Sequence, residues 1–286
     1  MKDYGIKVSK SGFDVKYLDA NNENPNLSFT SKYDVLKVSS MGSGTFNTGS
    51  TATIAHGLGY PAAFITYLSL DNSTWHIYDG RSYIDSTNLV IGKDQPTTTN
   101  YYYMATGDDN CADYVGGTYF VGYGMGVGRG STYNINGGMR FPSVTETSGI
   151  TSAEIGLKIQ YPSPRTGAVE VLTYGIDEDN TANFSSEPFG RTRTTAYVDN
   201  SCDNGITDIW AYDVTSIVSE ILGRSGWSSG NAMGFTFLND ANSDNHYIQT
   251  YSDTNSYLKI TRTTAPQTVY YKYVIFTNKL DSSKTI

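Results

Sequence analysis

Few residues in this chain of 286 have the types and spacing that acid–base or nucleophilic chemistry requires. A nucleophile needs a base beside it, but the three histidines, His56, His76 and His246, accompany no Gly-x-Ser-x-Gly motif. Cys111 and Cys202 belong to no Cys-x-x-Cys or catalytic signature, and no His/Cys cluster has zinc-site spacing. The two cysteines could form a disulfide, but two reduced structural thiols are the favoured interpretation. The sequence therefore predicts no catalytic nucleophile.

Carboxylates offer a second chemistry, because two of them on either side of a sugar linkage can hydrolyse it. The candidates are Asp177, Glu178 and Asp179 in "GIDEDNTANF", or the pair Glu146 and Glu154. The simpler interpretation is that these are solvated loop acids. We therefore expect the protein not to be an enzyme.

The same acidic run could instead hold a metal ion. Ca²⁺ prefers carboxylate and carbonyl oxygens, and Asp177, Asp179 and Asn180 supply such oxygens within four residues. The run lacks the fixed spacing of an EF-hand loop, so solvated acids remain the alternative to a structural calcium ion. No other cofactor is expected.

Exposed aromatic side chains are the third kind of candidate, because an aromatic ring can cover the apolar face of a sugar while polar neighbours bond its hydroxyls. Tyrosine gives large contact area at a low cost in conformational entropy. Packing in the core or on an ordinary sheet surface is the alternative for each of them. The candidate ligand-binding residues are Trp75, Tyr78, Trp210, Tyr212, Tyr247 and Tyr251.

Composition indicates the kind of elements that must position these residues. The chain has 24 tyrosines and 29 glycines, and only 17% of its residues are charged, which favours strands joined by tight polar turns. A net charge of −8 and a pI of about 4.8 argue against binding to nucleic acid. No apolar run approaches the ~20 residues that span a bilayer, so no membrane insertion is expected. Residues 1–12 lack a secretory signal core, which predicts assembly in the cytoplasm.

One segment differs from this pattern by predicting a helix. In "DVTSIVSEILGRSGWSSGNAMGFTF" (213–237), the apolar residues fall at helical spacing on one stripe. Asp213 is placed to cap the helix and Gly223 to end it in a left-handed conformation. So short a helix is unstable alone, so it must pack on a sheet. We expect Ile217 and Ile221 to be buried and Trp227 to continue the core.

The strand pattern predicts an all-β protein: a small β-sandwich domain that carries a jelly-roll β-sandwich with one short helix. Short strand-like runs fill residues 1–107, and a second series with turns about every dozen residues fills 111–264. Residues 87–110 resemble residues 256–279, each with a Thr-rich loop before a Tyr-rich strand. Two arrangements fit: an insertion, with 266–286 completing the first module, or two sequential modules.

Several motifs of the second module resemble jelly-roll carbohydrate-binding modules. The resemblance covers about residues 118–262, and the helix with "GWSSGNAMGF" is its most specific part. Modules of this kind occur in large bacterial and phage surface proteins, where they adhere or stabilise. The motifs that carry the resemblance, in chain order, are "GGMRFPSV", "ITSAEIGLKIQY", "YGIDEDNTANF", "RTRTTAYV", "DVTSIVSEILGRSGWSSGNAMGFTF" and "YLKITR".

The first module is similar to a small domain of bacteriophage tail-fibre, tail-tip and other virion proteins. The similarity rests on "YGIKVSKSGFDV", "LSFTSKYDVLKV" and "ATIAHGLGYPAAFITY" in this order. That domain often ends in a Tyr-rich strand that runs into "IF" and a polar "NKL". Residues 270–280, "YYKYVIFTNKL", match this ending better than "YYYMATGDDN" does, which favours insertion.

These resemblances imply a non-enzymatic virion structural protein, associated with tail or capsid, that displays the jelly roll toward a host-surface or environmental glycan. Implied partners are other virion proteins and further copies of the chain, with a trimer as the first expectation. The alternatives are a bacterial cell-surface carbohydrate-binding protein and, third, a glycan-degrading enzyme. The expected location is the virion, assembled in the host cytoplasm.

Overall fold

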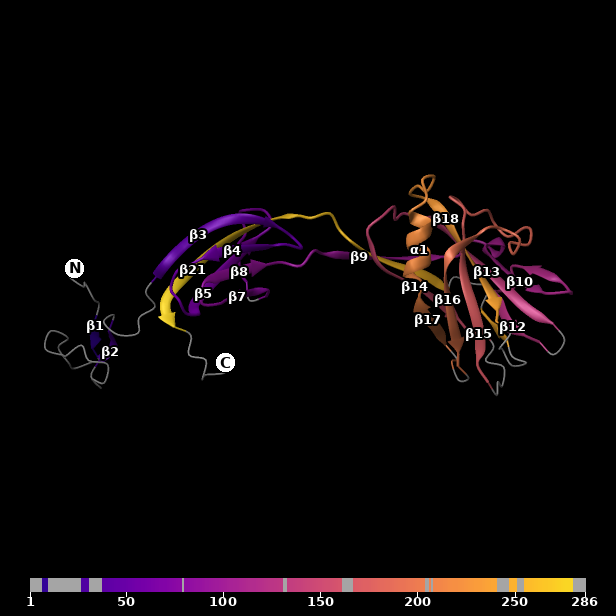
Figure 1. The fold of residues 1–286 in the computed structure, drawn as a ribbon, viewed down its shortest axis with the longest axis horizontal. Coiled ribbons are helices and arrows are strands. Elements are labelled where there is room, and N and C mark those ends of the chain that lie inside the picture. The colour runs from indigo at the N-terminus through magenta and orange to yellow at the C-terminus, as the bar shows by residue number, and fades with distance from the viewer. Residues whose placement is uncertain are drawn as a thin grey trace. The chain divides into compact units, whose positions relative to one another are not determined.

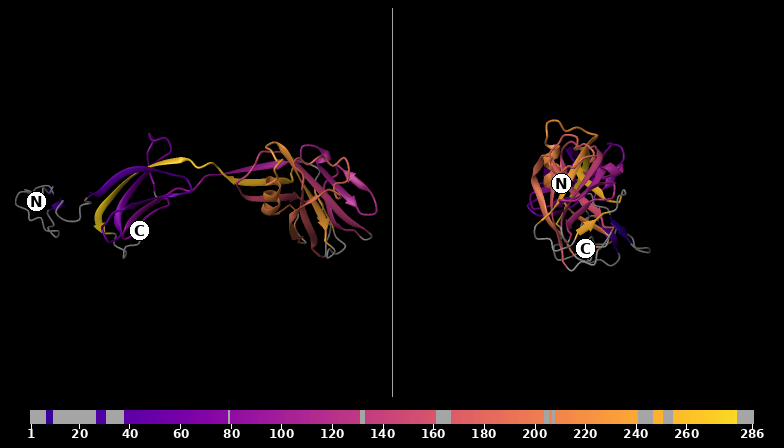
Figure 2. Two further views of the ribbon diagram at one scale, coloured as in Figure 1. Left: turned by 45° about the horizontal axis from the view of Figure 1, so that its top comes forward. Right: turned by 90° about the vertical axis from the view of Figure 1, so that its right-hand side faces the viewer.

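The computed structural model describes most of the chain. The residues described are 7–9, 27–30, 38–78, 80–130, 133–160, 167–203, 206, 208–240, 247–250 and 255–279. Within these ranges, side chains are described from residue 38 to residue 277. The strands of each part can be followed in Figures 1 and 2.

Antiparallel strands dominate the chain, with one α-helix and one 3-10 turn among the described residues. The all-β fold class is therefore confirmed. The elements up to residue 103 are β1 (Lys7–Ser9), β2 (Leu27–Thr30), β3 (Val38–Asn47), β4 (Thr51–Ala55), β5 (Ala62–Ser69), β6 (His76–Ile77), β7 (Ser82–Ile84), β8 (Asn88–Gly92) and β9 (Thr97–Tyr103). Those up to residue 158 are η2 (Gly107–Asp109), β10 (Asn110–Tyr114), β11 (Tyr119–Val121), β12 (Gly126–Arg129), β13 (Asn134–Val144) and β14 (Ile150–Lys158). The remainder are β15 (Val169–Ile176), β16 (Arg193–Cys202), β17 (Ile209–Asp213), α1 (Thr215–Leu222), β18 (Asn231–Asn239), β19 (Tyr247–Gln249), β20 (Tyr257–Thr263) and β21 (Thr268–Lys279).

The chain divides into two compact units. Unit 1 comprises Met1–Pro96 together with Ala265–Ile286, and unit 2 comprises Thr97–Thr264. The C-terminal strand β21 pairs along its length with β3 on one side and β5 on the other. It is thus an inner strand of unit 1, which is the arrangement that an insertion requires, and Figure 1 shows it between these strands.

Unit 1 contains a four-stranded sheet in the order β3-β21-β5-β6 and a three-stranded sheet in the order β4-β8-β7. Leu89 and Ile91 of β8 and Val269 and Ile275 of β21 are fully buried in its core. Glycines in "MGSG" (41–44) allow the tyrosine rings of β21 to lie flat on the neighbouring strand, because a Cβ at Gly42 or Gly44 would meet the facing ring.

Unit 2 is a sandwich of an eight-stranded and a four-stranded sheet. The main path of the larger sheet is β11-β10-β13-β18-β15-β16, with β12 paired to β13 and β19 paired to β12, and the order of the smaller sheet is β17-β14-β20-β9. Side chains that alternate along these strands fill one continuous core, which includes Phe141, Ile155, Phe235 and Leu258. The core therefore depends on strands from the whole length of the unit.

One boundary differs from the sequence prediction. Residues 97–103 were expected to belong to the first module (1–107), but β9 pairs with β20 from Thr97 opposite Thr263 to Tyr103 opposite Tyr257. It is an edge strand of the smaller sheet of unit 2. Its inward residues explain the placement, because Asn100 and Tyr102 bond Glu146 of unit 2. The Tyr-rich composition that 97–103 shares with 268–279 did not distinguish the two strands.

The predicted helix is confirmed. Ile217 and Ile221 are fully buried, and Trp227 is buried with its indole N–H donating to the Glu146 carbonyl at 2.8 Å. The cap expected at Asp213 is wrong by one residue, because Val214 is the N-cap and makes no side-chain cap hydrogen bond; Asp213 precedes it and accepts the backbone N–H of Thr215 at 2.8 Å. The left-handed end expected at Gly223 is wrong: its φ is −75°, and its N–H continues the helical hydrogen bonding to the Ser219 carbonyl.

Cys111 and Cys202 are both buried and form no disulfide with each other, as the sequence interpretation favoured. Burial raises the pKa of the Cys111 thiol to about 12. Because the thiolate is the reactive form, we expect neither thiol of the native protein to react rapidly with a thiol reagent such as DTNB, and two equivalents to react after denaturation. Rapid modification of one equivalent in the native state would contradict this burial.

Candidate functional site

Two of the six predicted ligand-binding residues lie in the core. Trp210 is 5% exposed and Tyr212 is 8% exposed, and their rings are 4.7 Å apart. They occupy alternate positions of β17 that face inward, while Ile209, Ala211 and Asp213 face out. The phenol of Tyr212 bonds the Thr173 hydroxyl at 2.9 Å in the interior. The prediction that these two residues bind a ligand is therefore wrong, and core packing explains them.

A third predicted residue, Tyr247, belongs to an aromatic cluster at the edge of the larger sheet. Tyr114 packs edge-on against Phe120 at 5.3 Å and against Tyr133 at 5.1 Å. Burial, followed by the nearby phenols of Tyr247 and Tyr133, raises the pKa of Tyr114. A hollow of about 190 Å³ adjoins the cluster at Phe120 and Tyr123. Tyr251 lies outside the described residues.

The two predicted residues in unit 1 are both covered by lysine. The ammonium of Lys272 lies 3.9 Å from the centre of the Trp75 ring, and that of Lys93 lies 5.8 Å from the Tyr78 ring. Both aromatic side chains are half-buried. A lysine ammonium of the same unit thus lies over one face of each ring.

The predicted calcium ligands do not fit a calcium ion. Arg224 pairs with Asp177 and, at 2.8 Å, with Asp179, so one guanidinium lies between the two carboxylates. The Asn180 side-chain oxygen already accepts the Ala232 backbone N–H at 2.8 Å. A fixed positive charge repels a divalent cation. No group of metal-ligating side chains was found elsewhere among the described residues.

The other acids considered as catalytic residues have separate partners. Glu146 is 2% exposed and accepts hydrogen bonds from Asn100 at 2.7 Å and from the Tyr102 phenol. Glu178 pairs with Arg191 at 3.5 Å. Glu154 lies on the outer face of β14, where it accepts the Tyr257 phenol at 2.9 Å. Each carboxylate is thus part of a local bonded group.

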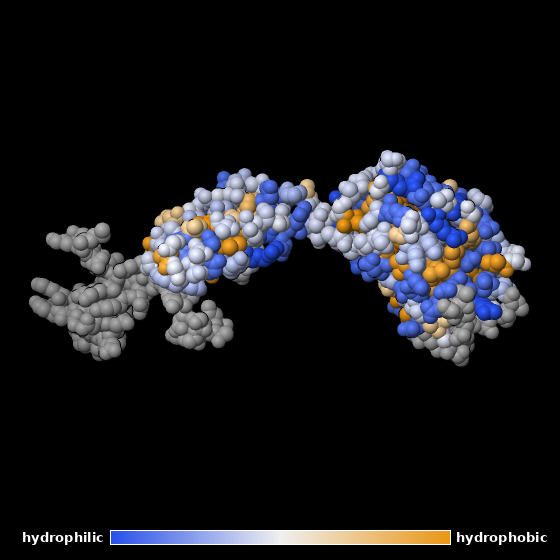
Figure 3. All heavy atoms as spheres, viewed as in Figure 1, coloured by the Kyte–Doolittle hydropathy of each residue, from blue (hydrophilic) through white to orange (hydrophobic). Residues whose placement is uncertain are grey.

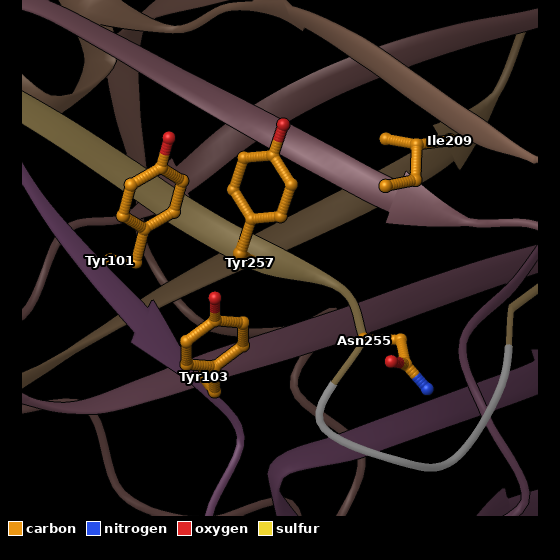
Figure 4. A pocket seen from close by; sticks show the side chains of 5 residues that line it. All are labelled: Tyr101, Tyr103, Ile209, Asn255 and Tyr257. Carbon is orange, nitrogen blue, oxygen red and sulfur yellow. The ribbon is translucent and has the colours of Figure 1, made fainter.

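The outer face of the smaller sheet of unit 2 presents three tyrosines that sequence analysis did not select. Tyr101 and Tyr103 are alternate residues of the edge strand β9, and Tyr257 lies on the adjacent strand β20. Tyr101 is 49% exposed and Tyr103 is 43% exposed. Tyr101 and Tyr257 meet edge-to-face at 5.3 Å, and all three phenols point the same way in Figure 4. We call these three residues the tyrosine platform.

Gly156 fixes the position of the Tyr257 ring. Gly156 on β14 is directly opposite Tyr257, and a Cβ there would collide with the tyrosine ring, so the ring lies across the glycine. Its hydroxyl donates to Glu154. Partial burial, followed by this hydrogen bond, raises the pKa of Tyr257 to about 12, so the phenol stays a donor at neutral pH. One ring face therefore packs on the sheet.

A shallow hollow of about 420 Å³ adjoins the tyrosine platform. Ile209 of the opposite edge strand and Asn255, which precedes β20, complete its lining, as Figure 4 shows. Hydrophobic side chains also reach the surface of unit 2 in patches on the face shown in Figure 3. The hollow beside Phe120 and Tyr123 is also lined by three aromatic rings and an amide, those of Tyr114, Phe120, Tyr123 and Gln249, but at about 190 Å³ it is the smaller of the two.

The platform residues could have been found by their period of two. "NYYY" (100–103) places Tyr101 and Tyr103 on one face of any strand, and "SYLK" (256–259) places Tyr257 and Lys259 on one face. The sequence alone did not show that these two segments are neighbouring strands. Only the pairing of β9 with β20 brings the three rings together.

Comparison with known proteins identifies no family. No family model matches the chain, and no curated protein matches it significantly. Among solved structures, a glycoside hydrolase in complex with neoagarooctaose is 11% identical, with a TM-score of 0.20, over 84% of this chain and 33% of the other. The VP2 subviral particle of infectious bursal disease virus is 10% identical, with a TM-score of 0.18, over 85% and 82%. The chain spans about a third of the length of the first of these, and similarity at these TM-scores carries no argument about fold or function.

Proposed function

We propose that the protein is a non-enzymatic adhesion protein that binds glycan through the outer face of the smaller sheet of unit 2. The observation that carries the proposal is the tyrosine platform beside an open hollow. The rings supply flat apolar surfaces, while the phenols and the Asn255 amide supply hydrogen-bonding groups beside them. Sugars present the same combination of an apolar ring face and a rim of hydroxyls.

A binding role agrees better than a catalytic role with the acids of this unit. Glycosidases need one carboxylic acid and one carboxylate that flank the scissile bond. Among the described residues, the acid that bonds a platform ring is Glu154, which accepts the Tyr257 phenol and lies 3.6 Å from the ammonium of Lys259. Asp177 and Asp179 are held by Arg224. These contacts support an adhesive module without hydrolytic activity.

The virion setting of the proposal rests on the resemblance of the first module to phage tail and virion domains. In this proposal unit 1 attaches the protein to other virion proteins and unit 2 faces the host surface or an environmental glycan. Self-association in several copies, with a trimer as the first expectation, belongs to the same proposal. Native mass spectrometry of the purified protein measures the number of copies in the oligomer directly.

The alternative of a bacterial cell-surface carbohydrate-binding protein shares the same binding face. Gene neighbourhood separates the two, because tail or capsid genes on both sides favour a virion protein and polysaccharide-utilisation genes favour the bacterial one. A degrading enzyme is the third alternative. It would release new reducing ends from a bound polysaccharide, and we expect none.

Removal of one platform ring is expected to weaken glycan binding. In Tyr103→Ala the sugar loses a stacking surface, and we expect affinity to fall about tenfold, which is about 1.4 kcal/mol. A polysaccharide panel identifies the ligand of the unaltered protein, and isothermal titration calorimetry then measures the change. Tyr197→Ala is the matched control, because Tyr197 is 54% exposed on β16 of the other sheet. Equal losses in both variants would contradict the platform as the site.

A further inference from the structure

The sheet register arranges the surroundings of the tyrosine platform in rows that cross all four strands. From β17 to β9, one row, which we call the platform row, consists of Ala211, Gly156, Tyr257 and Tyr103. The row next to it, which we call the charged row, consists of Asp213, Glu154, Lys259 and Tyr101. The platform row carries only small residues between Tyr257 and β17, which leaves the hollow open on that side.

The cations beside the platform are already paired with carboxylates. Lys259 lies 3.6 Å from Glu154, and Lys158, on the far side of the platform row, pairs with Asp208. Asp213 adds a further carboxylate to the charged row. The two lysines are thus outnumbered by three carboxylates among the described residues around the platform, and the whole chain carries a net charge of −8. An anionic sugar would meet no uncompensated cation there.

The hollow beside the platform extends from one edge strand of the smaller sheet to the other, since its lining includes Tyr103 of β9 and Ile209 of β17. β9 and β17 are the two edge strands in the sheet order, so among the described residues no further strand closes either end. Three strand spacings of about 4.8 Å give a width of roughly 14 Å, which exceeds one sugar ring. A chain can therefore cross the hollow and leave it at both sides.

From these features we propose that the tyrosine platform selects uncharged polysaccharides and binds them along the chain instead of at a chain end. This inference rests on the proposed function, since it names the ligand class of the same site. Selection arises because stacking and hydrogen bonding to hydroxyls operate without charge, while the paired lysines and surplus carboxylates disfavour uronate or sulfate groups.

The test uses neutral polysaccharides, each paired with its own carboxymethyl derivative, titrated calorimetrically into the full-length protein. We expect the neutral polymer to bind at least tenfold more tightly than its derivative, with affinity unchanged between low and high salt. We also expect several protein molecules per long chain, whereas a site for chain ends saturates at one per end. Tighter binding of the derivative that falls with salt, or saturation at one protein per end, would overturn the inference and leave the proposed function intact.

A charge variant tests the cause of the selectivity. Glu154→Gln keeps an acceptor for the Tyr257 phenol but leaves Lys259 without its carboxylate partner, so binding of the carboxymethyl derivative should strengthen severalfold. Asp199→Asn, at an exposed position of β16, makes the same change in net charge elsewhere and should have no effect. An equal response of the two variants would contradict the role of the local ion pair. If no polysaccharide binds, or if binding survives alanine at all three platform tyrosines, the proposed function itself is wrong.

Discussion

A chain that ends after Thr264 is expected to lose the fold of unit 1 while unit 2 stays folded. The truncation removes β21, which pairs with both β3 and β5 and supplies Val269 and Ile275 to the core. Without it, β3 has no partner among the described strands, and the core of the remaining sheet is exposed. Unit 2 keeps every strand of both its sheets.

Three fragments separate the contributions of the segments: 1–96, 97–264, and 1–96 joined to 265–286 by a short Gly/Ser linker. We expect the first to be unfolded and the other two to unfold cooperatively on heating, as measured by circular dichroism. A short linker suffices because Thr97 and Thr263 are directly opposite each other on adjacent strands. If 1–96 proved stable and 97–264 needed the C-terminal segment in order to fold, the two units would be sequential modules and the insertion wrong.

Ile221→Asp is expected to destabilise unit 2 by about 3–5 kcal/mol, which is comparable to the whole stability of many domains. The Ile221 side chain is fully buried between α1 and the larger sheet, where its end atom lies close to Gly175 of β15. A carboxylate at this position would be charged without a partner, or neutral and badly packed.

Two of the three tryptophans, Trp210 and Trp227, lie in the core of unit 2, so fluorescence follows its unfolding. Ser216→Asp is the control, because it places the same side chain at an exposed position in the first turn of the same helix. There an acid is compatible with the helix dipole, and no loss is expected. An Ile221→Asp protein with the midpoint of the parent would show that the helix is not packed as the structure has it.

Local patterns predicted the parts of the fold that depend on neighbours in sequence. The apolar stripe of α1 was predicted correctly because helical spacing shows within a few residues. The assignment of 97–103 failed because a tyrosine-rich edge strand carries no local sign of its partner. The pairing of two strands that are more than 150 residues apart in sequence depends on how the whole core packs.

The candidate site was harder to predict for the same reason. Trp210 and Tyr212 had the right residue types, but the period of β17 turns them inward, and nothing in "DIWAYD" fixes which face is the interior. Tyr101, Tyr103 and Tyr257 become one surface only through the register of two strands that are far apart in sequence. Residue type thus indicated the chemistry, while the pairing of strands determined its location.

The pairing of β9 with β20 also has a mechanical consequence. These two strands carry the tyrosine platform, and the same two strands lead directly into the two connections between the units, at Thr97 and Thr263. Tension on a ligand held at the platform would pass along both strands and be shared by two covalent tethers in parallel. A protease cut in either tether would leave the binding unit attached through the other, so detachment requires two breaks. For the adhesive role that we propose, this doubles the covalent attachment without any added residue.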